Sequence, residues 1–139
     1  MITNPTDIRV GYLLMNGDNL IEVREIRRGE IVYDYCKGKD PLTLRFEALR
    51  SAFLSVDQLK QIGFFHRGDE LERDGVLINT YGRESTSMLD SFVVSSIFPM
   101  KDGRLVTIPH EFYAIHQLQD YYQILNLKTP DFLKLLKTK

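Results

Sequence analysis

The sequence predicts an α+β fold, built from an N-terminal SH3-like β-meander, a short helix, β-hairpins and a C-terminal helix pair. Three observations support this class. Apolar residues alternate with a period of two near the N-terminus, a capped helical pattern follows at Ser55, and the helical period returns from about Tyr113. The length of 139 residues is that of one typical domain. Because no linker or internal repeat divides the chain, we expect a single domain over residues 1–139.

The N-terminal meander is predicted to contain four short strands, which cover Ile8–Met15, Asn19–Ile26, Glu30–Cys36 and Leu42–Ala48. Asn16-Gly17 and Gly29 supply turns, since Asn-Gly and glycine adopt the positive φ angles that tight hairpins need. In the third strand Ile31, Tyr33 and Tyr35 fall on one face. Strands this short favour a small curled sheet of the SH3-like half-barrel kind.

A short helix is predicted after this meander. Ser55 and Gln58 have the spacing of a capping box, and Gly63 suits the left-handed position that follows a helix. The apolar residues of the segment recur at every third position and are expected to pack on a sheet: Val56, Leu59 and Ile62.

A second β region is predicted from Phe64 onward. Asp74-Gly75 and Asp102-Gly103 are hairpin-turn dipeptides, and the stretches around them are rich in β-branched and aromatic residues. Two hairpins are therefore expected, within Leu71–Tyr81 and Ser91–Ile108. The polar stretch Gly82–Ser87 is expected to be an exposed connection.

The C-terminal region predicts two helices. The first has an apolar stripe at spacings of three and four, formed by Ile115, Leu118, Tyr122 and Leu125. Asn126–Lys128 interrupts this pattern. Thr129 and Pro130 then fit an N-cap and a first helical position, and a short apolar helix is expected to dock on the body through Phe132, Leu133, Leu135 and Leu136.

The composition is that of an ordinary globular protein, with 43% hydrophobic and 27% charged residues and a net charge of −1. The single cysteine, Cys36, allows no internal disulfide, which fits a reducing compartment. The first residues lack a basic segment followed by an apolar one, and no apolar run is long enough to cross a membrane. These features predict a cytoplasmic protein without membrane contact.

The motifs of common enzymes are missing. His66, His110 and His116 lack zinc-ligand spacing, and His110-Glu111 fails the metalloprotease pattern at Ala114. The serines of Gly82–Ser87 lack the second glycine of a nucleophile elbow, and the scattered glycines form no phosphate cradle. We therefore expect no enzyme, no catalytic residue, no metal and no cofactor. Cys36 has lysines nearby but no partnering histidine.

The leading hypothesis is a non-enzymatic protein-interaction module. If the apolar stripe of the terminal helix faces the core, then His116, Gln119 and Gln123 form a polar stripe that a partner can contact. The partner is either another protein, of unknown identity, or a second copy of the chain, which would bind this helix or an exposed sheet edge. A solvated helix face that binds nothing is the alternative interpretation.

The alternative function is a small nucleic-acid-binding module that uses the meander. Its candidate residues are basic and lie close to Tyr33 and Tyr35: Arg24, Arg27, Arg28, Lys37 and Lys39. Acidic residues are interspersed among them and reduce the positive field, which makes nucleic acid the less favoured partner.

The segment Ile115–Tyr122, which reads Ile-His-Gln-Leu-Gln-Asp-Tyr-Tyr, resembles the His-Gln-Leu-Gln-Asn-Leu-Tyr type ending of a family of small bacterial proteins. Those proteins are uncharacterised, of Bacteroidetes type and often prophage-associated. The resemblance extends to Arg9–Tyr12, Phe46–Leu49, Leu54-Ser55 and Leu59–Phe64. This sequence departs from the family pattern at Asp120-Tyr121, in place of Asn-Leu, and at Asn126-Leu127, in place of Thr-Gly. The resemblance implies a cytoplasmic protein whose terminal helix is a family signature, and it carries over no functional residue.

Overall fold

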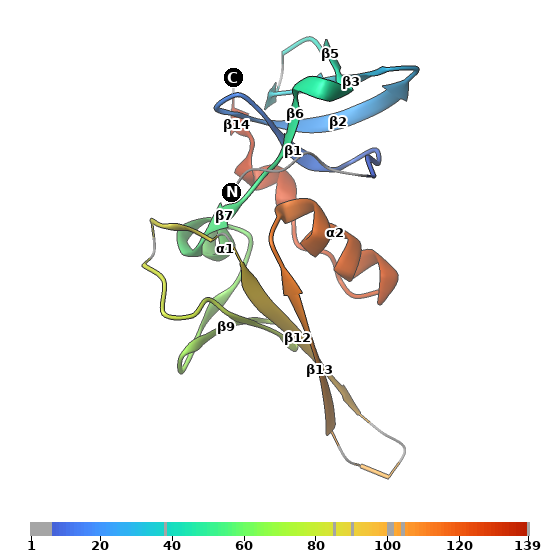
Figure 1. The fold of residues 1–139 in the computed structure, drawn as a ribbon. Coiled ribbons are helices and arrows are strands. Elements are labelled where there is room, and N and C mark those ends of the chain that lie inside the picture. Colours follow the sequence, from blue (N-terminus) through green and yellow to red (C-terminus); the bar gives the residue numbers. More distant parts are fainter. Residues whose placement is uncertain are drawn as a thin grey trace. The chain divides into compact units, whose positions relative to one another are not determined.

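The computed structural model describes residues 7–37, 39–84, 86–89, 91–99, 102–103 and 105–138, and its strands and helices form an α+β fold (Figure 1). The predicted α+β class is confirmed. The chain divides into two compact units. The first comprises the chain up to Ala52 together with the chain from Ala114 onward, and the second comprises Phe53–Tyr113. That residues 1–139 act as a single domain stays a prediction.

The first unit contains an antiparallel sheet with the strand order β5-β3-β2-β1-β6. Its strands are β1 (Leu13–Asn16), β2 (Asn19–Arg27), β3 (Glu30–Asp34), β5 (Leu42–Arg45) and β6 (Leu49–Ser51). The predicted turns at Asn16-Gly17 and Gly29 join β1 to β2 and β2 to β3. Both glycines have positive φ, of 58° and 79°, as these turns require.

Three predicted strands of this unit are shorter than expected, and the third ends at Asp34 instead of Cys36. The first begins at Leu13 because Arg9–Tyr12 forms a turn, in which the Tyr12 amide donates to the Arg9 carbonyl at 3.2 Å and Gly11 has a φ of 93°. The fourth strand ends at Arg45, where the 3₁₀ helix η1 (Phe46–Ala48) begins. An apolar, alternating pattern alone does not reveal these two interruptions.

The sheet of the first unit has to be curled. β5 and β6 lie at its opposite edges, yet only the three residues of η1 separate them. Outer strands of a flat five-stranded sheet would be about 19 Å apart, at four spacings of about 4.8 Å. The four Cα steps from Arg45 to Leu49 span at most about 14 Å. The inner face of the curled sheet carries a core of seven buried residues: Tyr12, Leu14, Ile21, Val23, Ile31, Tyr33 and Leu49.

Helix α2 (Ile115–Ile124) belongs to the first unit and contacts β1 (Figure 1). Three residues of its predicted stripe, Ile115, Leu118 and Tyr122, are buried, and Leu125 is half-buried. The helix ends in a Schellman motif, because the amide of Leu127 donates to the Tyr122 carbonyl and Asn126 has a φ of 53°. The predicted interruption at Asn126–Lys128 is thus confirmed.

The second member of the predicted helix pair is a 3₁₀ helix, η2 (Phe132–Leu135), and not an α-helix. Its N-cap is Asp131, whose carboxylate accepts from the Leu133 amide at 3.2 Å, so the predicted cap at Thr129 is wrong. The segment docks through Phe132 and Leu136, which are buried. Beyond it β14 (Lys137–Thr138) pairs in parallel with β4 (Cys36–Lys37), a long-range pairing for which the sequence has no signal.

The second unit begins with β7 (Leu54–Ser55), which pairs with β11 (Met88–Leu89), and continues with helix α1 (Val56–Gln61). The predicted capping box is present, since the Gln58 amide donates to Ser55 Oγ and the Ser55 amide donates to Gln58 Oε1. The three apolar residues of this helix segment, Val56, Leu59 and Ile62, are buried as predicted.

A five-stranded antiparallel sheet completes the second unit, in the order β13-β12-β10-β9-β8. Its strands are β8 (Phe65–Arg67), β9 (Glu70–Arg73), β10 (Val76–Asn79), β12 (Phe92–Pro99) and β13 (Leu105–Phe112). Both predicted hairpins are confirmed as strand pairs. The described residues of the predicted connection Gly82–Ser87 are largely exposed, while Ser85 lies outside the described residues.

None of the helices in the described residues is long and apolar enough to cross a membrane.

Candidate functional site

Helix α2 is fastened to the start of the first sheet by a polar clamp, which consists of Gln119 and Asp120 on the helix and Gly11, Tyr12 and Leu13 near β1. The side-chain amide of Gln119 makes two hydrogen bonds to the backbone: Nε2 donates to the Gly11 carbonyl at 2.8 Å, and Oε1 accepts from the Leu13 amide at 2.9 Å. The Tyr12 hydroxyl donates to Asp120 Oδ2 at 2.5 Å. The clamp therefore joins two segments that lie more than a hundred residues apart in the chain.

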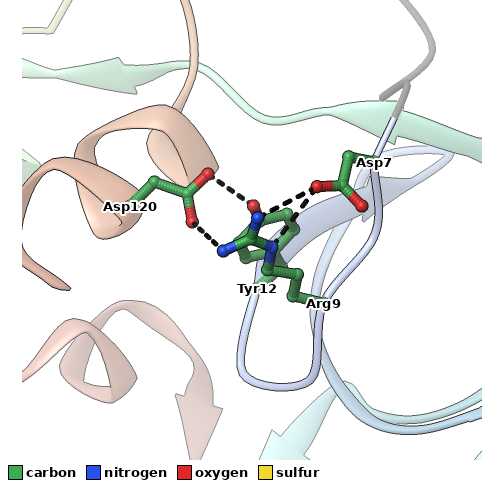
Figure 2. A network of polar contacts seen from close by, with 4 residues as sticks. All are labelled: Asp7, Arg9, Tyr12 and Asp120. Atoms are coloured by element: carbon green, nitrogen blue, oxygen red, sulfur yellow. Dashed lines mark hydrogen bonds and ion pairs between the residues drawn. The ribbon is translucent and has the colours of Figure 1, made fainter. Parts of the chain in front are cut away.

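Figure 2 shows the charged side of this clamp. Arg9 lies between two carboxylates, with Nη2 at 3.2 Å from Asp7 Oδ2 and Nη1 at 4.0 Å from Asp120 Oδ1. The Arg9 side chain is 55% exposed, so these ion pairs contribute little to stability. Burial, followed by the hydrogen bond to Asp120, raises the pKa of Tyr12 well above its ordinary value. Tyr12 therefore remains a neutral hydrogen-bond donor.

His116 packs against the same tyrosine. The two ring centroids are 5.2 Å apart with the planes tilted by 42°, and His116 Nδ1 is buried without a hydrogen-bond partner among the described residues. Burial lowers the pKa of His116, while Asp120 and Asp7 act in the opposite direction. The ring is thus held mainly as a neutral packing group.

The predicted polar stripe of α2 does not form one exposed face. Gln119 is half-buried in the clamp, His116 is half-buried against Tyr12, and only Gln123 is exposed. The apolar stripe faces the core as predicted, but the prediction that the three polar residues share one exposed face was wrong. The helix is covered over a wider arc than its apolar residues indicate, since a glutamine can satisfy a backbone amide and a backbone carbonyl at once. A partner-binding role for these three residues stays a prediction.

A second feature of the first unit is a hollow of about 110 Å³ at one end of the curled sheet, which we call the tyrosine hollow. Six residues line it: Asn16, Asn19, Ile21, Tyr33, Tyr35 and Leu42. The strand register explains how they converge. Asn16 pairs with Asn19 at the end of the β1–β2 hairpin, and Tyr33 of β3 pairs with Leu42 of β5. The sequence pattern predicts Tyr33 and Tyr35 on one face. It does not indicate the part of the asparagines, because Asn16 was interpreted as a turn residue and Asn19 as the start of a strand.

The tyrosine hollow combines an apolar floor with uncharged hydrogen-bonding groups. Ile21 is fully buried, whereas Asn19 and Leu42 are exposed at the rim. Asn16 Nδ2 donates to the Tyr33 hydroxyl at 3.4 Å, which leaves the hydroxyl proton of Tyr33 and the amide oxygen of Asn16 able to meet another molecule. None of these six lining residues carries a charge at neutral pH. The hollow can therefore accept a small neutral group.

The basic residues of the nucleic-acid hypothesis do not form a free cationic stripe. Arg24 Nη1 lies 3.1 Å from Asp34 Oδ2 and 3.7 Å from Glu22 Oε1, and Arg27 Nε lies 3.1 Å from Glu25 Oε1. Arg28 and Lys39 are exposed, while the side chain of Lys37 lies outside the described residues. Nucleic-acid binding stays a prediction.

The residues considered for catalysis lie in different surroundings. Cys36 is buried, His66 is exposed on β8, and His110 lies on β13 with its ring stacked on Phe112. Within the described ranges no three histidine, cysteine or acidic side chains gather as ligands for a metal ion. The absence of an enzyme activity stays a prediction.

No family model, curated protein or solved structure matches the chain.

Proposed function

We propose that the chain is a non-enzymatic protein-interaction module, and that the tyrosine hollow receives one side chain of a partner protein. The size of the hollow carries this proposal. It measures about 110 Å³, whereas sites for small-molecule substrates or cofactors occupy about 300–1,000 Å³. A hollow of this size holds one side chain rather than a metabolite.

The surroundings of the hollow favour a protein partner as well. Leu42 belongs both to the rim of the hollow and to β5, the outermost strand of the sheet. Among the described residues β5 pairs only with β3, so its other edge is open to an added strand. A partner segment in extended conformation can thus lie along β5 while one of its side chains enters the hollow.

The curled sheet is, in this proposal, an SH3-like half-barrel with the hollow at its mouth. The order of its strands, with η1 linking the two edge strands, is consistent with such a barrel. Barrel mouths are frequent places for ligands. The proposal nevertheless rests on the hollow and not on the barrel, because barrels of this kind serve many unrelated functions.

A pair of variants tests the proposal. Leu42→Arg places a charged side chain at the rim, where the leucine is 46% exposed, and should block the hollow without disturbing the core. Ile26→Arg is the matched control, because Ile26 is 42% exposed and lies at the other end of β2 from Asn19. A partner captured by the wild-type chain should bind the purified Ile26→Arg chain equally and the purified Leu42→Arg chain far more weakly.

Two results would contradict the proposal. The first is a partner that binds the Leu42→Arg chain as well as the wild type. The second is a chain that stays strictly monomeric by light scattering and captures no specific protein by affinity purification or cross-linking.

A further inference from the structure

Tyr81, in the second unit, is held in a backbone conformation that does not suit a tyrosine. It follows β10 in a β-turn, in which the Arg83 amide donates to the Thr80 carbonyl at 3.1 Å. The two central residues of this turn, Tyr81 and Gly82, both have positive φ, of 53° and 70°. Glycine, asparagine and aspartate dominate such turns, and a bulky residue there is strained. The strained turn presents Tyr81 to solvent, with 55% of the residue exposed, and strain of this kind is concentrated at functional sites.

The register of the sheet brings Tyr113 to the same end of the sheet as Tyr81. Asn79 of β10 and Glu111 of β13 both pair with Val93 of β12, one on each side. Because β10 and β13 are both antiparallel to β12, they run in the same direction, about 10 Å apart at two strand spacings. Tyr81 and Tyr113 each lie two residues beyond this row, and Tyr113 is 50% exposed. Two exposed tyrosines thus follow neighbouring places at one end of the sheet.

Glu111 adds a negative charge to this pair of rings. The hydrogen bond that the Tyr113 hydroxyl donates to the Glu111 carboxylate, together with the charge of Glu111, raises the pKa of Tyr113. Tyr81 acts on Tyr113 in the same direction, so the two hydroxyl groups lie within electrostatic reach of each other. The exposed carboxylate therefore lies beside Tyr113 and on the side of the sheet from which both tyrosines extend.

The charges of the surroundings favour a cation. The register row of Glu111 and the turn after β10 contain these described charges, with Glu72 as the partner of one of them: Arg67, Glu70, Glu72, Arg83, Glu84 and Glu111. Arg67 forms an ion pair with Glu72 at 2.7 Å. Arg83 and Glu84 are adjacent, exposed and of opposite sign. The carboxylates of Glu70 and Glu111 leave a negative excess, and Asp90, which precedes β12, lies outside the described residues.

The hydrogen bonding of Glu111 narrows the class of cation. A lysine ammonium is strongly hydrated and needs acceptors for three N–H donors, but this carboxylate already accepts from Tyr113. An arginine pairs best with both oxygens of a carboxylate. A quaternary ammonium group has no donor to satisfy, and the faces of aromatic rings attract it.

We propose that Tyr81, Glu111 and Tyr113 bind a quaternary ammonium group, such as that of choline or of trimethyllysine. The two rings contact the methyl groups, and the carboxylate supplies the opposite charge. All three residues belong to the second unit, so this site is independent of the tyrosine hollow.

Titration with two molecules of the same shape tests the proposal. Choline carries the quaternary ammonium group, whereas dimethylbutanol has carbon in place of the nitrogen and is neutral. Each is added to the isotope-labelled full chain and followed by amide chemical shifts. Choline should shift the amides of Tyr81 and Tyr113 and should bind about tenfold more tightly than dimethylbutanol. A third probe, the acetylated methylamide of trimethyllysine, identifies the source: tighter binding than choline indicates a modified partner protein, weaker binding a free choline-type compound, and both support the ligand class.

Two variants separate binding from folding. Tyr81→Asn places a residue that favours positive φ in the strained turn, so its urea midpoint should equal or exceed that of the wild type while its affinity for choline falls about fivefold or more. Glu111→Gln keeps an acceptor for the Tyr113 hydroxyl but removes the charge, and it should weaken choline binding by a similar factor. Phe65→Leu is the control and should bind choline as the wild type does, because Phe65 is 54% exposed on β8, at the opposite edge of the sheet from β13.

Three results would overturn the proposal. The first is equal affinity for choline and dimethylbutanol, which would show that the charge is not recognised. The second is unchanged choline binding by the Tyr81→Asn and Glu111→Gln chains. The third is the absence of any shift of the Tyr81 and Tyr113 amides at high millimolar choline.

Discussion

Replacing Gln119 by leucine should destabilise the first unit, because it removes both hydrogen bonds of the polar clamp while preserving the size of the side chain. The bonds join Gln119 to the Gly11 carbonyl and to the Leu13 amide. β6 pairs with β1 from Leu14 onward, so the clamp begins where that pairing ends. Gln119 Oε1 is the acceptor that the structure shows for the Leu13 amide, and leucine offers this amide no acceptor.

The magnitude follows from the burial of the two backbone groups. Leu13 is fully buried, and leaving its amide unsatisfied costs about 1–3 kcal/mol. Gly11 is half-buried, so water can reach its carbonyl and the loss there is about 0.5–1 kcal/mol. Together these give about 1.5–4 kcal/mol, a sizeable part of the stability of a typical domain, which is about 5–15 kcal/mol.

The assay is urea unfolding of the Gln119→Leu chain beside the Gln123→Leu chain. Both variants replace glutamine by leucine in α2, but Gln123 is exposed, so its substitution should change stability by no more than about 0.5 kcal/mol. At a mid-range loss of about 2.8 kcal/mol and an m-value of about 2 kcal/mol/M, Gln119→Leu should lower the midpoint by about 1.4 M urea. If the two variants unfold at the same urea concentration, Gln119 does not hold α2 against β1 through the two hydrogen bonds of the clamp.

Four further predictions concern the other groups described above. The stability difference between the wild type and Tyr12→Phe should be largest below pH 10 and shrink as the pH rises above 10, because burial and the bond to Asp120 raise the pKa of Tyr12 in the folded chain. Urea midpoints of the two chains across alkaline pH measure this difference. A difference that does not change with pH would contradict the prediction. Burial lowers the pKa of His116 below its ordinary 6.5, so neutral His116 stabilises the fold above pH 6.5, and this stabilisation is lost as the pH falls below 6.5. The urea midpoint of the wild type should therefore lose its advantage over that of His116→Gln between pH 7.5 and pH 5. An advantage that grows instead would show that Asp120 and Asp7 outweigh burial. Ser55→Ala should cost about 1 kcal/mol in thermal or urea unfolding because it removes the capping bond to the Gln58 amide, and an unchanged midpoint would count against that cap. Mixed DNA and RNA oligonucleotides at low salt should form no salt-dependent complex if the meander serves protein binding, whereas a complex that weakens steeply with salt would favour the nucleic-acid alternative.

Local sequence signals predicted the parts of the fold that depend on neighbouring residues. Asn16-Gly17 and Asp74-Gly75 form the expected hairpin turns, because the conformational preference of these dipeptides acts over two residues. Ser55 and Gln58 form the expected capping box for the same reason.

The parts that depend on distant residues could not be predicted. The pairing of β14 with β4 joins segments that lie far apart in the chain, and a two-residue strand has too short a pattern to be recognised. Gly11 lies in a segment whose apolar residues predict a strand, and the turn there is evident only from the structure, by the positive φ of Gly11 and the hydrogen bond from the Tyr12 amide to the Arg9 carbonyl.

The candidate site was missed for a related reason. Gln119 was assigned to an exposed face because polarity alone does not distinguish a glutamine that meets water from one that meets a backbone. The tyrosine hollow needs two hairpins brought side by side, so that Asn16 and Asn19 approach Tyr33 and Leu42. Its tyrosines were visible in the sequence pattern, but its shape depends on the curl of the sheet.

Site-specific photocrosslinking in living cells tests the central claim most directly. A photoreactive residue is introduced at Leu42, on the rim of the tyrosine hollow, or at Ile26, which is similarly exposed elsewhere on the same sheet. We expect a defined protein to be crosslinked from Leu42 and not from Ile26, and to bind the purified chain. Identical crosslinks from both positions, or none from Leu42, would contradict the assignment of the hollow as the docking site.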